Sequence, residues 1–245
     1  MPTTRSHGIG EASALVPHDG PVYHYTSSDG LLGIVKSGQL RASEASSLND
    51  LAEVELGWAA VENWLRKHKK SRSAKYLKRM LEDSRRDPKH QVFVLSGTTA
   101  GDDANQWRLY ADQGRGYAIE LDGSVALGVV SLDPKEDVHG TPAFGKITEF
   151  TRVVPWYHVL YDEKSLEKAM DALVAYADTE LAAMDVADHD DAALSMREIL
   201  DEELSDELAM IAHLVKSSGF RGEQEVRVVA RFMWFGKHVG YRAGA

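Results

Sequence analysis

The sequence predicts an α+β fold, in which a mixed or antiparallel central sheet carries long helical insertions. Short segments of strand character occur near the start, in the middle and near the end of the chain, at residues 21–26, 91–96 and 225–232. Two stretches, about 50–86 and 163–217, instead repeat apolar residues at helical spacing. No internal repeat or low-complexity linker divides the chain, so we expect one domain at residues 21–245 after a flexible tail at residues 1–20.

The amino-terminal part is predicted as a strand followed by a short helix. Residues 21–26 form the strand, and Ser27 is well placed to cap a helix that runs through Leu31 and Val35. Gly38 suits the position just after that helix, because glycine readily adopts the left-handed conformation found there.

The remaining elements follow from the same two periodicities. Helices are expected at residues 51–65 and 73–81, and across 163–217 with a break at 188–191 and an end at Gly219. Strands are expected at 91–96, 116–121 and 225–232, with weaker candidates at 125–130, 146–154 and 158–161. A short helix between the first two of these strands carries Trp107 and Tyr110.

Composition restricts the chemistry of the chain. It contains no cysteine, so disulfides, thiolate zinc sites and cysteine nucleophiles are absent. The isolated histidines and the polar loop at residues 188–191 predict no metal site. The first twenty residues lack the apolar core of a signal peptide, and no later segment has the length of a membrane span. We therefore expect a cytoplasmic protein with no membrane partner.

Charge argues against broad binding to nucleic acid, although it does not exclude it. The net charge is −10 at pH 7, whereas phosphate backbones are bound by lysine and arginine. The one strongly basic run, from Arg66 to Arg79, is interpreted as the solvated face of a helix.

Ionisable side chains inside otherwise apolar strands indicate the candidate site. Residues 23–26 read Tyr-His-Tyr-Thr, and the last strand begins near Glu223, Glu225 and Arg227. Burying such groups costs free energy unless they are paired or used. Because alternate strand residues point to the same face, Glu223 and Glu225 are expected to face one cleft. A structural salt bridge between Glu225 and Arg227 explains those two residues equally well.

Structural roles also compete for the other candidates. Asn49 and Asp50 precede an amphipathic helix and are interpreted first as its cap. Trp107 and Tyr110 share a helix face, which more often indicates core than a stacking platform. His24 fits least well in an apolar core, because its ring nitrogens need hydrogen-bond partners.

Taken together, these motifs resemble an uncharacterised bacterial family. They follow one another in order along nearly the whole chain: Tyr-His-Tyr-Thr at 23–26, Gly-Leu-Leu-x-Ile-x-x-Ser-Gly-x-Leu at 30–40, Asn-Asp-x-x-Glu at 49–53, Trp-x-x-Tyr at 107–110, Gly-Tyr-x-Ile-Glu at 116–120 and Glu-x-Glu-x-Arg at 223–227. That family is classed as a domain of unknown function and includes abortive-infection proteins of the AbiGi type. The resemblance implies a role in phage defence.

A looser similarity extends to ADP-ribosyltransferase-like folds, which have a split sheet. In those folds a His or Arg on the opening strand holds NAD, and a late strand carries a catalytic Glu. The similarity implies NAD as a substrate and a protein or nucleotide as acceptor. It implies catalytic roles for Glu225, Glu223 and His24. It implies cofactor-binding roles for His24, Tyr25, Thr26, Arg41, Trp107, Tyr110 and Arg227.

We therefore expect an NAD-dependent ADP-ribosyltransferase or NAD glycohydrolase that acts in bacterial defence or toxicity. A carboxylate beside the ribose would stabilise the positive charge that develops when the nicotinamide bond breaks. The first alternative is a non-enzymatic ligand-sensing or protein-interaction module, and the second is an enzyme directed at nucleic acid. The oligomeric state is left open. The enzymatic hypothesis requires His24 and Glu225 to lie in one cleft.

Overall fold

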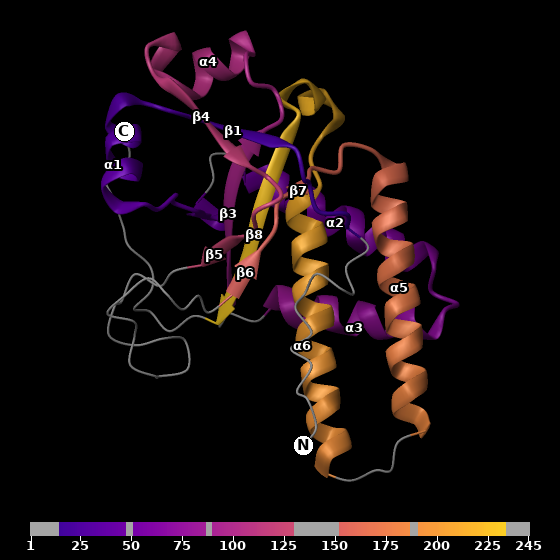
Figure 1. Ribbon diagram of the computed structural model, residues 1–245. Helices are drawn as coiled ribbons and strands as arrows, with labels where there is room; N and C mark the ends of the chain where they lie inside the picture. Colours follow the sequence, from indigo (N-terminus) through magenta and orange to yellow (C-terminus); the bar gives the residue numbers. More distant parts are fainter. Residues whose placement is uncertain (1–14, 48–50, 87–89, 130–151, 187–190, 234–245) are drawn as a thin grey trace.

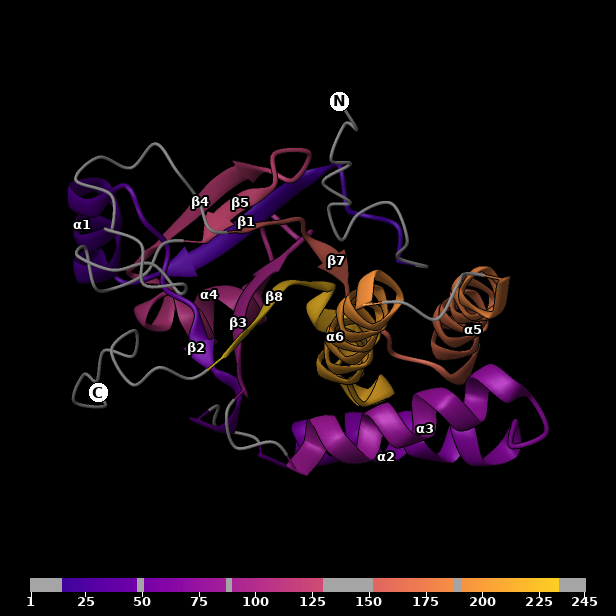
Figure 2. The ribbon, with the colours of Figure 1, turned by 90° about the horizontal axis from the view of Figure 1, so that it is seen from below.

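The computed structural model describes residues 15–47, 51–86, 90–129, 152–186 and 191–233. Within them, a largely antiparallel sheet has long helices gathered on one side (Figures 1 and 2). The fold is α+β, as the sequence predicts. Among the helices of these ranges, none has both the length and the apolar character needed to cross a membrane.

The central strand of the main sheet is β3. The strands are β1 (Pro21–Thr26), β2 (Ser43–Glu44), β3 (His90–Thr98), β4 (Tyr117–Asp122), β7 (Tyr157–His158) and β8 (Glu225–Met233). Their order is β4-β1-β3-β8-β7, and β2 also pairs with β3. A separate pair joins β5 (Leu127–Val129) to β6 (Arg152–Val154). The first and last strands of the sequence are therefore neighbours of β3, not of each other.

The helices lie where apolar periodicity predicts them. They are α1 (Ser28–Ser37), α2 (Leu51–Lys67), α3 (Arg72–Arg86), α4 (Ala104–Tyr110), α5 (Glu163–Val186) and α6 (Asp191–Leu214). Short 3-10 turns are η1 (Ala45–Ser47), η2 (Asp112–Gly114) and η3 (Ser218–Glu223). Both predicted caps of α1 are confirmed: the Ser27 side chain accepts from Gly30 N, and Gly38 is left-handed with φ of 66°.

One predicted boundary is wrong. The last long helix ends at Leu214 and not at Gly219, which lies in η3. The chain leaves the helix there because Leu160 offers strand-like partners: Leu160 N donates to Leu214 O, and Lys216 N donates to Leu160 O. This early exit brings Lys216 to the end of the sheet.

The pairing register determines which side chains share a face. Tyr23 is opposite Thr98, and Thr98 is opposite Glu225, so these three form one row across β1, β3 and β8. Directly opposed residues of antiparallel strands point to the same side, and neighbours along a strand alternate. Tyr23, Thr98 and Glu225 thus point to the face covered by the long helices, which we call the helix face. His24 points to the opposite face.

Two apolar cores cover the two faces. The larger packs the helices α2, α3, α5 and α6 on the helix face and includes Trp58, Leu77, Met170 and Leu208. The smaller lies on the opposite face, where Val22, Leu95, Trp156 and Val226 meet Val154 of the β5–β6 pair.

Part of the segment predicted as a flexible tail is packed. Leu15 is buried, and His18 N donates to Trp156 O at 2.8 Å. The rest of that tail, the predicted cap at residues 49–50, most of the weak strand at 146–154 and the end of the one at 125–130 lie outside the described residues. That residues 21–245 form one domain stays a prediction.

The close packing of α2 against α6 can be tested by substitution of a glycine. Gly57 lies so close to α6 that a β-carbon there would be 1.9 Å from Ala212 O. We expect Gly57→Ala to lower the free energy of unfolding by about 1–3 kcal/mol, because the two helices must move apart. Gly33→Ala in α1, where nothing lies within 4 Å, should instead be neutral or raise it by about 0.5–1 kcal/mol. Urea denaturation of both variants measures the difference, and equal effects would contradict the close approach.

Candidate functional site

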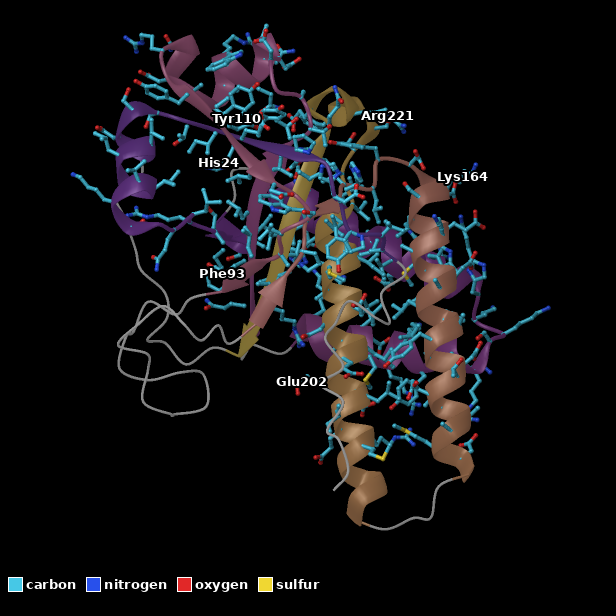
Figure 3. All side chains as sticks on the ribbon, viewed as in Figure 1. His24, Phe93, Tyr110, Lys164, Glu202 and Arg221 are labelled. Atoms are coloured by element: carbon cyan, nitrogen blue, oxygen red, sulfur yellow. The ribbon has the colours of Figure 1, made fainter. Side chains whose placement is uncertain are left out.

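Five charged side chains meet on the helix face, at the end of the sheet where β8 begins. We call them the ionic cluster: Glu53, Lys216, Glu223, Glu225 and Arg227. They come from the first turn of α2, the segment after α6, the end of η3 and the start of β8. Tyr110 and Arg221, which flank this region, are labelled at the same end of the sheet in Figure 3.

Lys216 holds the three carboxylates together. Its Nζ lies 2.7 Å from Glu223 Oε2, 2.9 Å from Glu225 Oε2 and 3.2 Å from Glu53 Oε1. The ammonium also lies over the Phe220 ring, 4.9 Å from its centre. The Lys216 side chain is only 7% exposed, so these interactions occur largely out of water.

Arg227 is enclosed in the same way. Its Nε and Nη2 donate to both oxygens of Glu225 at 2.7 and 3.0 Å, and Nη2 also donates to Glu53 Oε2 at 2.9 Å. Its Nη1 donates to the carbonyl oxygen of His213 at 2.7 Å. Every nitrogen of the guanidinium group therefore has a partner within the chain.

Opposite charges keep Glu225 and Lys216 ionised in spite of burial. Burial alone would raise the pKa of Glu225, but Arg227 and Lys216 outweigh it and hold that pKa below its usual value. Burial would likewise lower the pKa of Lys216, but Glu225, Glu223 and Glu53 raise it. With all five groups charged, three carboxylates face two cations. The cluster then carries one net negative charge.

Aromatic side chains of β1 and α4 are the other predicted members of the site. Tyr25 from β1 is buried, donates from its hydroxyl to Ala100 O at 3.1 Å and meets Trp107 edge-to-face at 5.0 Å. Tyr110, one helical turn further along α4, is half exposed. Burial raises the pKa of Tyr110, and the carboxylates of the cluster raise it further, with Glu223 the strongest of them. Tyr110 thus lies within electrostatic reach of the cluster.

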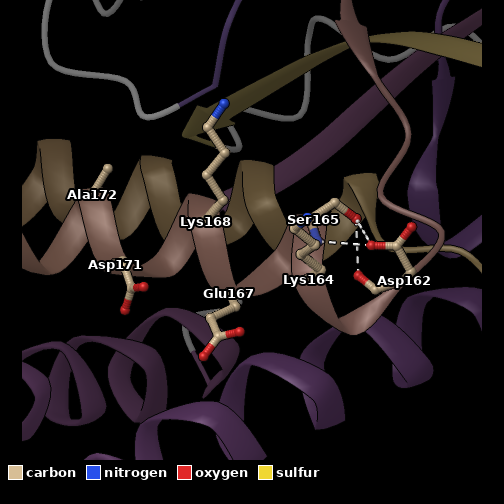
Figure 4. A pocket seen from close by; sticks show the side chains of 7 residues that line it. All are labelled: Asp162, Lys164, Ser165, Glu167, Lys168, Asp171 and Ala172. Carbon is tan, nitrogen blue, oxygen red and sulfur yellow. Dashed lines mark hydrogen bonds between the residues drawn. The ribbon is translucent and has the colours of Figure 1, made fainter.

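Two hollows in the described residues are not shaped as a deep binding pocket. Beside Arg227, between Glu53, Val94 and His213, is a void of about 10 Å³, room for about one water molecule. The larger hollow, about 690 Å³, lies open on the first turns of α5 and is lined mainly by charged side chains (Figure 4). No three His, Asp or Glu side chains in the described residues are placed to hold a metal ion.

The structure brings several of the predicted site residues together. Glu223, Glu225 and Arg227 belong to the ionic cluster, Tyr110 lies within its electrostatic reach, and Tyr25 and Trp107 contact each other. Whether these residues bind or react stays a prediction.

Three predicted residues lie elsewhere, so the expectation of a shared cleft for His24 and Glu225 is wrong. His24 points to the opposite face, where Nδ1 contacts the carbonyl oxygen of Ser96 at 3.2 Å. Burial lowers the pKa of His24, which favours the neutral ring. Thr26 shares its face by strand alternation, and Arg41 is exposed between α1 and β2.

The sequence analysis assigned no site role to two members of the cluster. Glu53 appears in the Asn-Asp-x-x-Glu motif, but its spacing suggests only the start of a helix. Lys216 directly follows the apolar run from Ile211 to Val215, interrupted only by His213. A lysine at the end of a buried apolar segment indicates a buried charge that needs a partner. The same pattern, a charged residue in an apolar segment, indicated Glu225 as a candidate.

Comparison with known families gives one match. A family model described as "Protein of unknown function (DUF2971)" matches residues 106–228, half of the chain, and the chain belongs to that family. Searches among curated proteins and among solved structures found no match. The matched region contains Trp107, Tyr110, Lys216 and the Glu-x-Glu-x-Arg motif, but not β1 or Glu53. The predicted membership of a family of unknown function is confirmed, and this family assigns no reaction.

Removal of one cation tests the cluster. Arg227→Met removes the two-point partner of Glu225 and leaves three carboxylates to share Lys216 alone, so we expect the free energy of unfolding to fall by about 3–5 kcal/mol. Arg221→Met breaks an exposed pair with Asp162 and should cost no more than about 1 kcal/mol. Denaturant unfolding of both variants checks this. Equal small losses would mean that water reaches the cluster freely.

His213 generates a prediction about pH. Burial and the nearby Arg227 lower its pKa from 6.5 to about 4, against the raising effect of the Ala209 carbonyl. Between these values the ring is neutral when folded and protonated when unfolded, so stability falls as pH falls from 6.5 towards 4. We expect this residue to contribute a slope of up to about 1.4 kcal/mol per pH unit.

The variant for this test is His213→Gln, which removes the titrating imidazole ring and leaves every other titratable group in place. Denaturant unfolding at several pH values between 6.5 and 4.5 should give a shallower slope for His213→Gln than for the parent chain. Identical slopes would show that other groups carry the acid sensitivity.

Proposed function

We propose that this protein cleaves NAD at the bond between nicotinamide and ribose, as an ADP-ribosyltransferase or an NAD glycohydrolase, in bacterial defence or toxicity. One observation carries the proposal: β1 and β8 present aromatic and carboxylate side chains to the same face, on either side of β3. The row Tyr23, Thr98 and Glu225 expresses this relation directly. The arrangement expected from ADP-ribosyltransferase-like folds, with His24 beside the late carboxylate, is not present, because His24 lies on the other face. The proposal therefore keeps only the relation between an opening and a late strand, with tyrosines of β1 in place of His24.

The charge of the site suits this reaction. When the nicotinamide bond breaks, positive charge develops on the ribose, and a fixed negative charge nearby lowers the barrier. The ionic cluster supplies one net negative charge that needs no rearrangement to act. Lys216 and Arg227 fix the positions of the carboxylates, so these cations serve as positioning residues.

Glu223 is the carboxylate best placed to meet a substrate. Its Oε2 accepts from Lys216, whereas no residue in the described part of the chain donates to its Oε1. Both oxygens of Glu225 are engaged by Arg227 and Lys216. We therefore assign contact with the ribose to Glu223, and orientation of the cluster to Glu225.

The aromatic side chains would bind the flat rings of NAD. Tyr110 is half exposed and lies within electrostatic reach of Glu223, so its ring is available for stacking against nicotinamide or adenine. Arg227 has no free nitrogen for a phosphate, and His24 lies on the other face. Neither residue contacts the substrate in this proposal.

The reaction itself is a substitution at the ribose carbon C1′. The bond from C1′ to the nicotinamide nitrogen breaks, and its electron pair stays on that nitrogen, which leaves as neutral nicotinamide. Water, or an oxygen or nitrogen of a protein or nucleotide acceptor, bonds to C1′ and releases one proton to the solvent. No oxidant, reductant or metal ion is consumed.

A second candidate is a non-enzymatic binding module, and the enclosure of the cluster favours it. Beside Arg227 there is a void of only about 10 Å³, far smaller than a dinucleotide. NAD would therefore have to lie across the outer edge of the cluster, against Glu223 and Tyr110. In a binding module the same edge would hold a partner without any bond being broken.

Nicotinamide release distinguishes the two candidates. Purified protein incubated with NAD should release nicotinamide, and Glu223→Gln should lower the rate by about 100–1000-fold, because the carboxylate acts on the transition state. Glu167→Gln, an equally conservative change on the exposed surface of α5, is the matched control and should keep the full rate. Chromatography of the reaction mixture provides the measurement.

Two outcomes of this experiment would contradict the proposal. No nicotinamide from the parent chain, together with no rise in melting temperature at millimolar NAD, would reject the enzyme and favour the binding module. Turnover that Glu223→Gln does not reduce would reject the role of Glu223.

A further inference from the structure

A basic segment at the end of the α2–α3 hairpin plays no part in the proposed function. Residues 66–79, which we call the basic hairpin, contain eight Lys and Arg residues and no Asp or Glu: Arg66, Lys67, Lys69, Lys70, Arg72, Lys75, Lys78 and Arg79. The net charge of the whole chain is −10 at pH 7. Positive charge is thus concentrated in one segment of a strongly acidic protein.

The hairpin holds these charges on its surface. All eight side chains are exposed, whereas the other side of α3 buries Ala74, Tyr76 and Leu77 in the core. Figure 2 shows the connection between α2 and α3 at the end of the molecule remote from α1 and β4. The apolar side of α3 is already covered, so this surface offers a partner charge and hydrogen bonds.

Two ion pairs join the basic hairpin to α5. Lys67 Nζ lies 2.7 Å from Glu163 Oε1 in the first turn of α5, and Arg72 pairs with Asp185 near its end. Ser73 also donates to Asp178 of the same helix. The hairpin is therefore held in a defined position by residues on both sides of its turn.

Several of the remaining cations have no anionic partner among the residues that the structure describes. In the described ranges, no ion pair engages Lys69, Lys70 or Lys75, and Arg66 bonds only the side-chain amide oxygen of Asn63. Arg79 lies over the Tyr76 ring, 5.2 Å from its centre, and has no ion pair with another described residue. Such a group of unpaired cations attracts a polyanion.

We propose that the basic hairpin is a docking surface for the phosphate backbone of a nucleic acid, bound without regard to sequence. On α3, Lys75 and Arg79 lie about one helical turn apart, roughly 6 Å, and face about two phosphates of one strand, whereas Arg72 in the same row is already paired with Asp185. The lysines of the turn extend this row. Release of counterions from the phosphates drives such binding.

The acidic remainder of the chain limits this binding but does not abolish it. At physiological salt, charges are screened beyond about 8 Å, so acidic residues remote from the hairpin repel a bound strand only weakly. An anionic membrane fits the surface less well, because a helix that lies on lipid inserts an apolar face, and that of α3 is buried. Nucleic acid is therefore the polyanion that this surface fits best.

The test measures binding of the full chain to labelled RNA and DNA of about 20 nucleotides by fluorescence anisotropy, between 50 and 200 mM salt. The variant Lys69→Gln/Lys70→Gln/Lys75→Gln removes three unpaired cations. If all three meet phosphates, the slope of log K against log salt should become shallower by about 2–3, and affinity at 50 mM salt should fall at least tenfold.

A matched variant removes the same total charge elsewhere. Lys36→Gln/Lys164→Gln/Lys168→Gln changes three exposed lysines of α1 and α5 and should keep the affinity of the parent chain within about twofold. Absence of binding at 50 mM salt, or an equal loss in both triple variants, would overturn the proposal. Tighter binding to anionic vesicles or to polyglutamate than to RNA of equal charge would also overturn it. Nicotinamide release plays no part in these measurements, so the two proposals fail separately.

Discussion

The guanidinium group of Arg227 joins three parts of the chain at one buried point. It bonds Glu53 at the start of α2, Glu225 on its own strand and the last turn of α6 through the His213 carbonyl. Transfer of such ions from water costs several kcal/mol each unless the geometry of pairing is good. The helical layer can therefore close over β8 only in the arrangement that brings Glu53 and Lys216 to this position.

This constraint explains which features were predictable from the sequence. The elements follow from local patterns, such as the caps of α1 and the apolar spacing of α2, and strand alternation correctly placed Glu225 and Arg227 on one face. The register of β1 against β3 leaves no trace in the sequence. That register turns Tyr23 and Tyr25 towards the helix face and His24 away from it. Lys216 was missed although Glu223 and Glu225 follow it closely in the sequence, because the early end of α6 that brings them together was not predicted.

The same enclosure bears on the chemistry of the site. Both carboxylate oxygens of Glu225 accept hydrogen bonds from cations of the cluster. Glu225 is therefore well oriented, but it has little remaining capacity to bind a substrate. Glu223, with one oxygen unengaged by the described residues, combines a fixed position with access from the edge. The cations therefore do not merely neutralise the site. They leave one net negative charge and direct it towards the side where Tyr110 is exposed.

The two proposed surfaces meet through α2, which carries Glu53 in its first turn and Lys67 at its end. Fourteen residues of helix separate these positions by about 21 Å, more than twice the distance over which charge is felt at physiological salt. A polyanion on the basic hairpin would therefore not change the ionisation of the cluster through space. Any influence would require α2 to move as a body against α6, and the close approach at Gly57 opposes that movement. Binding at the hairpin and chemistry at the cluster are accordingly expected to act independently.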